Sequence, residues 1–360
     1  MTGWTNSLID SSSAWLDHLT ADQQFVLFSA IKVVGAFCVV MPIVAYAVLA
    51  ERKVSAAIQD RHGPNRVGWF GIWQPVADGV KAFLKEDFTP GHVRKAYFWL
   101  APMIVMIPSL LVMAVIPFGS KIGGQRMVIA NLNVGILYTF GIVSLGVYGI
   151  VLAGYASNSK YPFLGGIRSS AQMISYEIAM GMSVIPVFLW VGNLNLGQVV
   201  LYQADNGWLI WHAPVSFVIF FIASFAETNR LPFDLPESEQ ELVAGYNTEY
   251  SSMKFALFFM GEYANMIAVS AMMVTLFLGG WTLPFPGLHS VAGDSQILLG
   301  VFHIVVFLAK VIFLMGIFIW VRWIWPRFRY DQLMDLGWRV FIPLALANIV
   351  ATAVWLWIIH

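Results

Sequence analysis

The sequence predicts an all-α, polytopic membrane protein with eight transmembrane helices, several of them kinked, and amphipathic surface helices on the cytoplasmic side. Composition is the first reason, since 59% of the 360 residues are hydrophobic and only 11% are charged, whereas globular chains are about half apolar and a quarter charged. Spacing is the second, because apolar stretches long enough to cross a ~30 Å hydrocarbon core recur along the whole chain. We therefore expect one integral membrane domain over 1–360.

The expected spans follow a polar leader over 1–24. The fifth span is the weakest because His212 and Pro214 interrupt it. Prolines in or beside other spans predict bends rather than breaks, since neighbouring helices can satisfy the freed carbonyls. The eight spans cover residues 25–50, 96–117, 132–154, 171–191, 208–226, 255–280, 297–321 and 338–359.

Lysine and arginine are distributed unevenly between the loops on the two sides. The loops after spans one, three, five and seven carry most of them, while the opposite loops carry only Lys121 and Arg126. Cytoplasmic loops are enriched in these residues. The sequence therefore predicts that the basic loops lie on the cytoplasmic or matrix face and that both termini lie on the outer face.

The segment 54–90 is too polar to cross a membrane, but its apolar residues recur at helical spacing, as at Val76, Val80 and Phe83. This pattern predicts two amphipathic helices at the interface, separated by a turn over Gly63–Gly68. Helices of this kind can frame a lateral doorway from the lipid.

Several classes of cofactor site are excluded for this chain. A lone cysteine, Cys38, cannot build a disulfide, a four-cysteine iron-sulfur site or a zinc site. Gly63 and Gly68 have the spacing of a phosphate-binding loop, but Trp69 stands where that loop needs lysine. The histidines show no pairing typical of haem. We expect no metal and no redox centre in this chain.

Glu177, Glu262 and Lys310 are charged residues that lie well inside predicted spans, whereas Lys32 lies in the outer part of span one. A charge at the bilayer centre costs at least ~2.5 kcal/mol on insertion scales, so each should face protein or water and have a partner. Carboxylates in such places are candidates for proton relay. A structural ion pair between helices is the alternative.

An acidic loop, expected over 229–252, follows the fifth span, which ends at Glu227. Asp234, Glu237, Glu239 and Glu241 lie within eight residues of one another. Like charges so close together cannot all ionise cheaply away from bulk water, so the group should titrate as a coupled set. A solvated acidic loop is the alternative interpretation.

Ordered sequence blocks along the chain resemble the signature of the H subunit of bacterial respiratory complex I, the NADH:quinone oxidoreductase, equivalent to mitochondrially encoded subunit one. The resemblance covers all eight predicted spans. The blocks are Glu51-Arg52-Lys53, Gly63-Pro64-Asn65-x-Val67-Gly68, Gln74-Pro75-x-Ala77-Asp78, Ala156–Tyr161, Ile174-Ser175-Tyr176-Glu177, Ala226–Leu235 and Pro326–Met334.

The resemblance implies a protein at the elbow between the peripheral and membrane arms of a proton-pumping complex in a bacterial or mitochondrial inner membrane. With two peripheral-arm subunits, it would enclose the chamber through which ubiquinone or menaquinone enters from the bilayer. Quinone would be the substrate, while FMN and the iron-sulfur clusters would belong to partner subunits. Neighbouring membrane-arm subunits and lipids complete the implied partners, and nucleic acid is not among them.

The resemblance also assigns roles to residues in three groups. It places Glu177, Glu227, Asp234, Glu237, Glu239 and Glu241 on an acidic path from the quinone chamber towards the proton channels. It places Arg52, Arg61, Phe233, Phe259 and Met260 near the chamber or its mouth, and Asp78, Lys81 and Glu86 on the second surface helix. Glu51 belongs to the channel group as well, although the charges around it could instead be membrane anchors.

The resulting hypothesis is that quinone reduction changes the charge in the chamber, the acidic loop reorganises, and Glu227 and Glu177 pass the change into the membrane arm. Glu239→Gln should then impair pumping. Two alternatives remain: the homologous membrane subunit of an energy-converting hydrogenase, and a stand-alone transporter. A stand-alone transporter would account for Glu262 and Lys310, but this sequence lacks the internal repeat that is common in transporters.

Overall fold

A computed structural model describes residues 20–122, 125–235, 243–284 and 296–359 of the chain. Within these ranges the fold is helical, apart from one antiparallel pair of two-residue strands, Lys121–Ile122 (β1) and Gln125–Arg126 (β2). The α-helices are α2 (Ala21–Ile58), α3 (Gln74–Leu84), α4 (Lys95–Leu111), α5 (Gly135–Ala156), α6 (Lys160–Val191), α7 (Leu196–Asn206), α8 (Leu209–His212), α9 (Pro214–Glu227), α11 (Ser252–Phe277), α12 (Gln296–Ile324), α13 (Tyr330–Asp335) and α14 (Ile342–Ile359).

Short 3₁₀ and π segments complete the fold. The 3₁₀ turns are η1 (Trp69–Gly71), η2 (Val112–Ala114) and η3 (Gly245–Asn247), and the π segment η5 (Leu336–Phe341) joins α13 to α14. Seven helices of the described chain are long and apolar enough to cross a membrane: Val26–Ile58, Lys95–Ala114, Gly135–Ala156, Lys160–Val191, Ser252–Phe277, Ile297–Ile324 and Tyr330–Ile359. These correspond to seven of the eight predicted spans and identify an integral membrane protein.

The fifth predicted span is interrupted in the structure. The chain forms the four-residue helix α8, leaves helical geometry at Ala213 (φ −134°, ψ 58°) and starts again as the 14-residue helix α9. Pro214 begins α9 because proline fits the first turn of a helix, where no amide donor is needed. At ~1.5 Å per residue α9 is about 21 Å long, less than the ~30 Å hydrocarbon core.

The prediction of two interfacial helices is wrong in one respect. The first is not a separate element, because α2 continues through residues 54–58 as one helix of 38 residues. No helix-breaking residue stands between Leu49 and Ile58, and the helix ends only where Asp60 adopts a positive φ of 52°. The second surface helix is present as α3, whose apolar side chains Val76, Phe83 and Leu84 are exposed.

A tight turn holds η1 against the end of α2. Gly71 has φ +75°, and a Cβ at this position would lie 2.2 Å from the carbonyl oxygen of Pro64. Only glycine fits such a close approach. The turn therefore presents Trp69 and Phe70, both largely exposed, beside α3.

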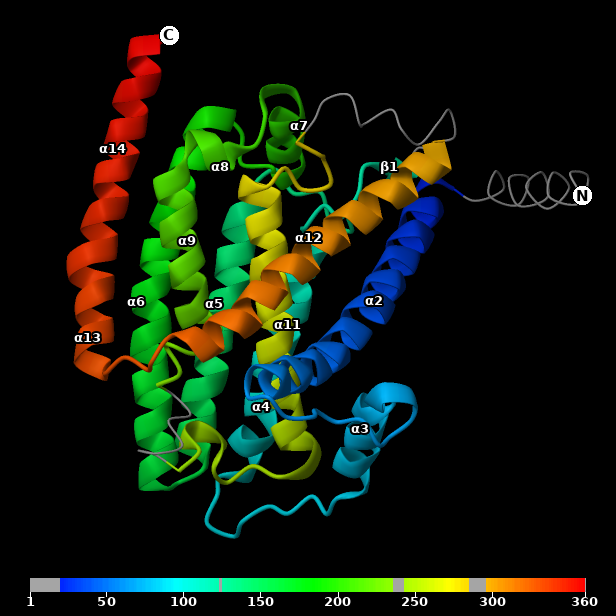
Figure 1. Cartoon of the computed structure of the whole chain (residues 1–360), viewed down its shortest axis with the longest axis vertical. Coiled ribbons are helices and arrows are strands. Elements are labelled where there is room, and N and C mark those ends of the chain that lie inside the picture. The colour runs from blue at the N-terminus through cyan, green and yellow to red at the C-terminus, as the bar shows by residue number, and fades with distance from the viewer. Residues whose placement is uncertain (1–19, 123–124, 236–242, 285–295, 360) are drawn as a thin grey trace, which may run out of the picture.

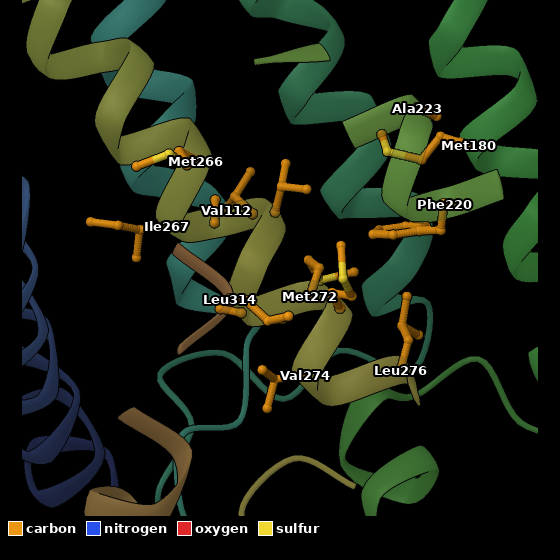
Figure 2. Packing of buried hydrophobic residues seen from close by; sticks show 14 of the residues in the cluster. Val112, Met180, Phe220, Ala223, Met266, Ile267, Met272, Val274, Leu276 and Leu314 are labelled. Atoms are coloured by element: carbon orange, nitrogen blue, oxygen red, sulfur yellow. The ribbon is translucent and has the colours of Figure 1, made fainter. Parts of the chain in front are cut away.

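The core is organised around α11, the most buried of the seven long helices, while α14 is the least buried. Figure 2 shows Met266, Ile267, Met272, Val274 and Leu276 of α11 packed with neighbours from other helices, including Val112, Met180, Phe220, Ala223 and Leu314. α14 packs on α6 and α9 at the edge of the bundle, and α12 crosses the bundle obliquely (Figure 1). The start of α2 and the end of α14 lie at the end of the bundle away from α3 (Figure 1).

Candidate functional site

A cavity of about 900 Å³ lies where the end of α2, the turn after it, α3, α11 and α12 meet. Its volume is within the ~300–1,000 Å³ of sites that bind small molecules. We call it the basic cavity, because four arginines line it together with His62, Gln74 and Trp323. The arginines are Arg52, Arg61, Arg66 and Arg322.

A buried carboxylate, Glu51, organises the inner wall of the basic cavity. Its side chain accepts hydrogen bonds from Arg230 Nη1 (3.0 and 3.3 Å to the two oxygens), from Arg322 and from the hydroxyl of Tyr263. The Arg230 guanidinium also lies 4.2 Å from the centre of the Tyr263 ring. Glu51, Arg230, Tyr263 and Arg322 form what we call the Glu51 network, which joins α2, α11, α12 and the end of α9.

The Glu51 network separates the basic cavity from a smaller one of about 200 Å³, the inner cavity. Arg322 lines both cavities, and Arg230 lines the inner one. The inner cavity also contacts Asn229, Asp234, Phe259 and Glu262. A third space of about 30 Å³ adjoins Asn229 and Glu262 on one side and Glu227 on the other. The three spaces are therefore neighbours, because Arg322 lines the first two and Asn229 and Glu262 line the last two.

Glu227 is 1% exposed, and neither of its carboxylate oxygens has a hydrogen-bond partner among the described residues. Glu177 on α6, which is half-buried, lies close enough to act on it electrostatically. Glu262 on α11 accepts a hydrogen bond from the hydroxyl of Tyr246 at 2.9 Å. The structure therefore brings the predicted acids Glu177, Glu227 and Glu262 into one region of the interior.

The first residues of the acidic loop are fixed to the bundle. Asp234 accepts a hydrogen bond from Arg327 at 3.0 Å, and the buried Phe233 stacks on Phe328 with ring centres 5.5 Å apart. The amide of Gln172, itself buried, donates at 2.8 Å to the carbonyls of Ala226 and Phe233. The other predicted loop acids, Glu237, Glu239 and Glu241, lie outside the described residues.

The charged residues of α3 connect it to the end of α2. Arg52 pairs with Asp78 at 2.7 Å, Gln74 donates to Asp78 at 3.1 Å, and Lys81 lies 3.9 Å from the same carboxylate. Glu86 is exposed beyond the end of α3. These contacts hold the amphipathic helix beside the basic cavity.

Phe259 and Met260, both predicted to lie near the quinone chamber, have different surroundings in the structure. Phe259 lines the inner cavity, whereas Met260 is partly buried against the hydrophobic core and lines neither the basic nor the inner cavity.

Lys310, the third predicted intramembrane charge, lies apart from the interior acids Glu227 and Glu262. Its ammonium donates to the carbonyls of Leu278 (2.6 Å), Gly280 (3.0 Å) and Thr282, so backbone dipoles rather than a carboxylate surround it.

Several residues that complete the site were assigned no role in it from the sequence, among them Arg230 and Arg322 of the Glu51 network. Tyr263 and Tyr246 bind the carboxylates of Glu51 and Glu262, and Gln172 fixes the loop. Tyr263 could have been found, since it follows Phe259 by four residues and so shares its helix face. Tyr246 and Gln172 carried no comparable signal. Among the described residues no group of three or more His, Cys, Asp or Glu could hold a metal ion.

Comparison with known proteins gives a consistent result. The NADH dehydrogenase family model matches residues 31–353. The chain is 50% identical over 339 residues to the NADH-quinone oxidoreductase H subunit 2 of Geobacter metallireducens, covering 90% of this chain and 94% of the relative. It is 51% identical over 333 residues to the H subunit of Paramagnetospirillum magneticum (91% and 93% covered) and 54% identical over 321 residues to that of Rickettsia bellii (88% and 90%).

The match extends over most of both partners in each comparison and includes the residues of the basic cavity, the Glu51 network and the interior acids. The chain therefore belongs to the family of NADH-quinone oxidoreductase H subunits and is a membrane subunit of that complex.

Proposed function

We propose that this chain forms the entry channel and part of the reaction chamber for quinone, and that it couples quinone reduction to proton translocation. The basic cavity is the observation that carries the proposal. Its volume suits a small molecule, and its arginines offer charged N–H donors to the carbonyl oxygens of a quinone headgroup. FMN and the iron-sulfur clusters would lie on partner subunits, since reduction needs an electron donor that this chain does not supply.

The surroundings of the basic cavity support entry from the lipid. Val76, Phe83 and Leu84 of α3 are exposed, as are Trp69 and Phe70 of the preceding turn. An amphipathic helix with such a face lies in the membrane interface. The Arg52–Asp78 pair holds α3 against α2 beside the basic cavity, so a quinone dissolved in the lipid would reach the cavity along this helix.

Coupling would pass through the Glu51 network and the interior acids. A change of charge in the basic cavity acts on Arg322, which also borders the inner cavity, and from there on Glu262 and Glu227. Glu227 has no hydrogen-bond partner among the described residues, so its protonation would respond strongly to a nearby charge. Glu177 would carry the change onwards, with Asp234, Glu237, Glu239 and Glu241 on the loop.

The fold also supports eight membrane crossings. Both described ends of the chain lie at the same end of the bundle (Figure 1), an arrangement that agrees with an even number of crossings. In addition to the seven long helices, α8 with α9 would supply the eighth as a broken span whose interrupted backbone is covered by neighbouring helices. The positive-inside rule places α3 on the cytoplasmic or matrix face and both termini on the outer face.

Arg52→Gln and Arg61→Gln test the role of the basic cavity in quinone binding. Loss of one charge-assisted hydrogen bond should raise KM for quinone about tenfold, while NADH:ferricyanide activity of the peripheral arm stays unchanged. Arg339→Gln, a matched change on an exposed arginine beside α14, should leave both activities as they were. Unaltered quinone kinetics in both cavity variants would rule out this cavity as the binding site.

Glu227→Gln and Glu239→Gln test coupling separately from binding. We expect quinone-linked proton pumping to fall in reconstituted vesicles, with NADH:ferricyanide activity intact. A normal ratio of protons to electrons in both variants would contradict the proposed path.

A further inference from the structure

A second large cavity lies at the end of the bundle opposite the basic cavity. It has a volume of about 650 Å³ and is lined by the first half of α2, the chain around the β1–β2 pair, and parts of α11 and α12. We call it the apolar cavity, because nearly all of its lining is hydrophobic, as at Val39, Ile304 and Phe307. At Gly35 a Cβ would meet no atom within 4 Å, so this wall of the cavity is open space.

Positive charges border the apolar cavity. Lys32 is the one charged residue that lines it within the described chain, and its ammonium donates to the carbonyl of Val128 at 3.3 Å. Ile122 and Gln125 also line it and form one facing pair of the β1–β2 hairpin. Lys121 and Arg126 form the other pair; they do not line the cavity and project from the other face of the hairpin, because side chains alternate along a strand.

The facing pair of cations is unfavourable in isolation. Like charges directly opposite each other on paired strands destabilise the pair. Lys121 and Arg126 are both exposed, and neither forms an ion pair with a carboxylate in the described part of the chain. An anion bound between them would remove this repulsion, so the arrangement favours a negatively charged ligand.

We propose that the apolar cavity binds one acyl chain of an anionic phospholipid, whose phosphate is held by Lys121 and Arg126 with Lys32 nearby. The ligand needs an apolar body and an anionic head, which is what the lining and its border provide. Moving an acyl chain from bilayer to cavity gives little hydrophobic gain, because lipid tails are equally apolar. Selectivity therefore comes from the three cations. The site is separate from the quinone site and does not depend on it.

The size of the cavity argues against a helix of a partner subunit as its occupant. A helix ~10 Å wide that rises 1.5 Å per residue occupies roughly 120 Å³ per residue. The cavity's volume of about 650 Å³ would then hold only about five residues, less than two turns. An apolar transmembrane helix would also leave Lys121 and Arg126 without a counter-charge.

The test uses the intact complex with Phe28, which lines the cavity, replaced by photoreactive p-benzoylphenylalanine. The complex is reconstituted into vesicles of equal parts phosphatidylglycerol and phosphatidylcholine, irradiated, and its adducts are weighed by mass spectrometry. Phosphatidylglycerol adducts should exceed phosphatidylcholine adducts at least about tenfold, the ratio expected from one charge-assisted hydrogen bond.

Two sets of variants in that background complete the test. Lys121→Gln with Arg126→Gln should reduce the preference for the anionic lipid. Gly35→Trp should occupy part of the cavity and reduce lipid adducts of both kinds, whereas Gly141→Trp, at an exposed position on α5 with equally open surroundings, should leave them unchanged. Equal labelling of the two lipids in the unaltered cavity, or crosslinking to a neighbouring protein instead of lipid, would overturn the proposal. The charge variants lie on an exposed hairpin, so they test it even if Gly35→Trp fails to assemble.

Discussion

The Glu51 network makes a quantitative prediction about stability. Glu51→Gln keeps the shape of the side chain but removes the charge that holds two guanidinium groups. Arg230 has only 10% of its side chain exposed, so its bond to Glu51 counts at nearly full strength, about 1.5–3 kcal/mol. Arg322 is 38% exposed, and screening reduces its share to about 1 kcal/mol.

The sum, about 3 kcal/mol, agrees with the ~3–5 kcal/mol cost of breaking a buried ion pair from one side. If half of it appears in the barrier to unfolding, thermal inactivation of the complex becomes roughly tenfold faster. The measurement is the rate at which inhibitor-sensitive NADH:quinone reductase activity of the purified complex is lost at one elevated temperature. Asp335→Asn, which breaks an ion pair between side chains that are 59% and 79% exposed, should change that rate less than about threefold.

A double-mutant cycle decides whether the charges act as a unit. Arg230→Gln alone leaves Glu51 with Arg322, and Glu51→Gln alone leaves two guanidinium groups facing each other. Removing both charges together should therefore cost less than the sum of the single changes, by about 1–3 kcal/mol. Additivity to within ~0.5 kcal/mol would show that the network is not an energetic unit and would refute this reasoning.

Three further predictions concern contacts inside the helical bundle. Gly165→Ala brings a Cβ within 2.9 Å of the η3 backbone and should lower the stability of the complex by about 1–3 kcal/mol. Gly181→Ala, whose Cβ meets nothing within 4 Å, should change the stability by less than ~0.5 kcal/mol. Equal rates of thermal inactivation for the two variants would contradict this prediction. Gln172→Leu removes one hydrogen bond from each of two buried carbonyls, which keep only the turn bonds from the Asn229 and Leu235 amides. The loss of about 0.5–1.5 kcal/mol for each bond should expose the chain after Phe233 to proteolysis, which an unchanged digestion pattern would disprove. Lys310→Met removes the donor shared by three carbonyls, so deuterium exchange over residues 278–282 should rise; unaltered exchange would argue against that role.

The sequence was sufficient for features that depend on local composition. Apolar length located the seven long helices, and helical periodicity located α3, because each of these properties is carried by adjacent residues. These predictions needed no knowledge of which segments meet in space.

Features that depend on junctions and long-range contacts could not be derived in the same way. The sequence does not distinguish a transmembrane helix that continues beyond the membrane from one that is followed by a separate surface helix, when no helix-breaking residue stands between them. The continuity of α2 beyond residue 50 was therefore not predicted. The Glu51 network assembles residues 51, 230, 263 and 322, whose proximity depends on how four segments pack. Arg322 was noticed only as a contributor to orientation, although it borders both cavities.

The unbroken length of α2 has a consequence for communication across the membrane. One face of its first half forms the wall of the apolar cavity, and its last turns carry Glu51, Arg52 and Ser55 into the basic cavity. A ligand in one cavity that changes the tilt of α2 would change the affinity of the other cavity for its own ligand. By thermodynamic linkage the effect would be reciprocal. Pro42 lies in α2 beside Ile43, at the end of the apolar cavity nearest the basic cavity, where proline removes one backbone hydrogen bond of the helix. Lipid composition in one leaflet would thereby set the affinity for a substrate that enters near the other.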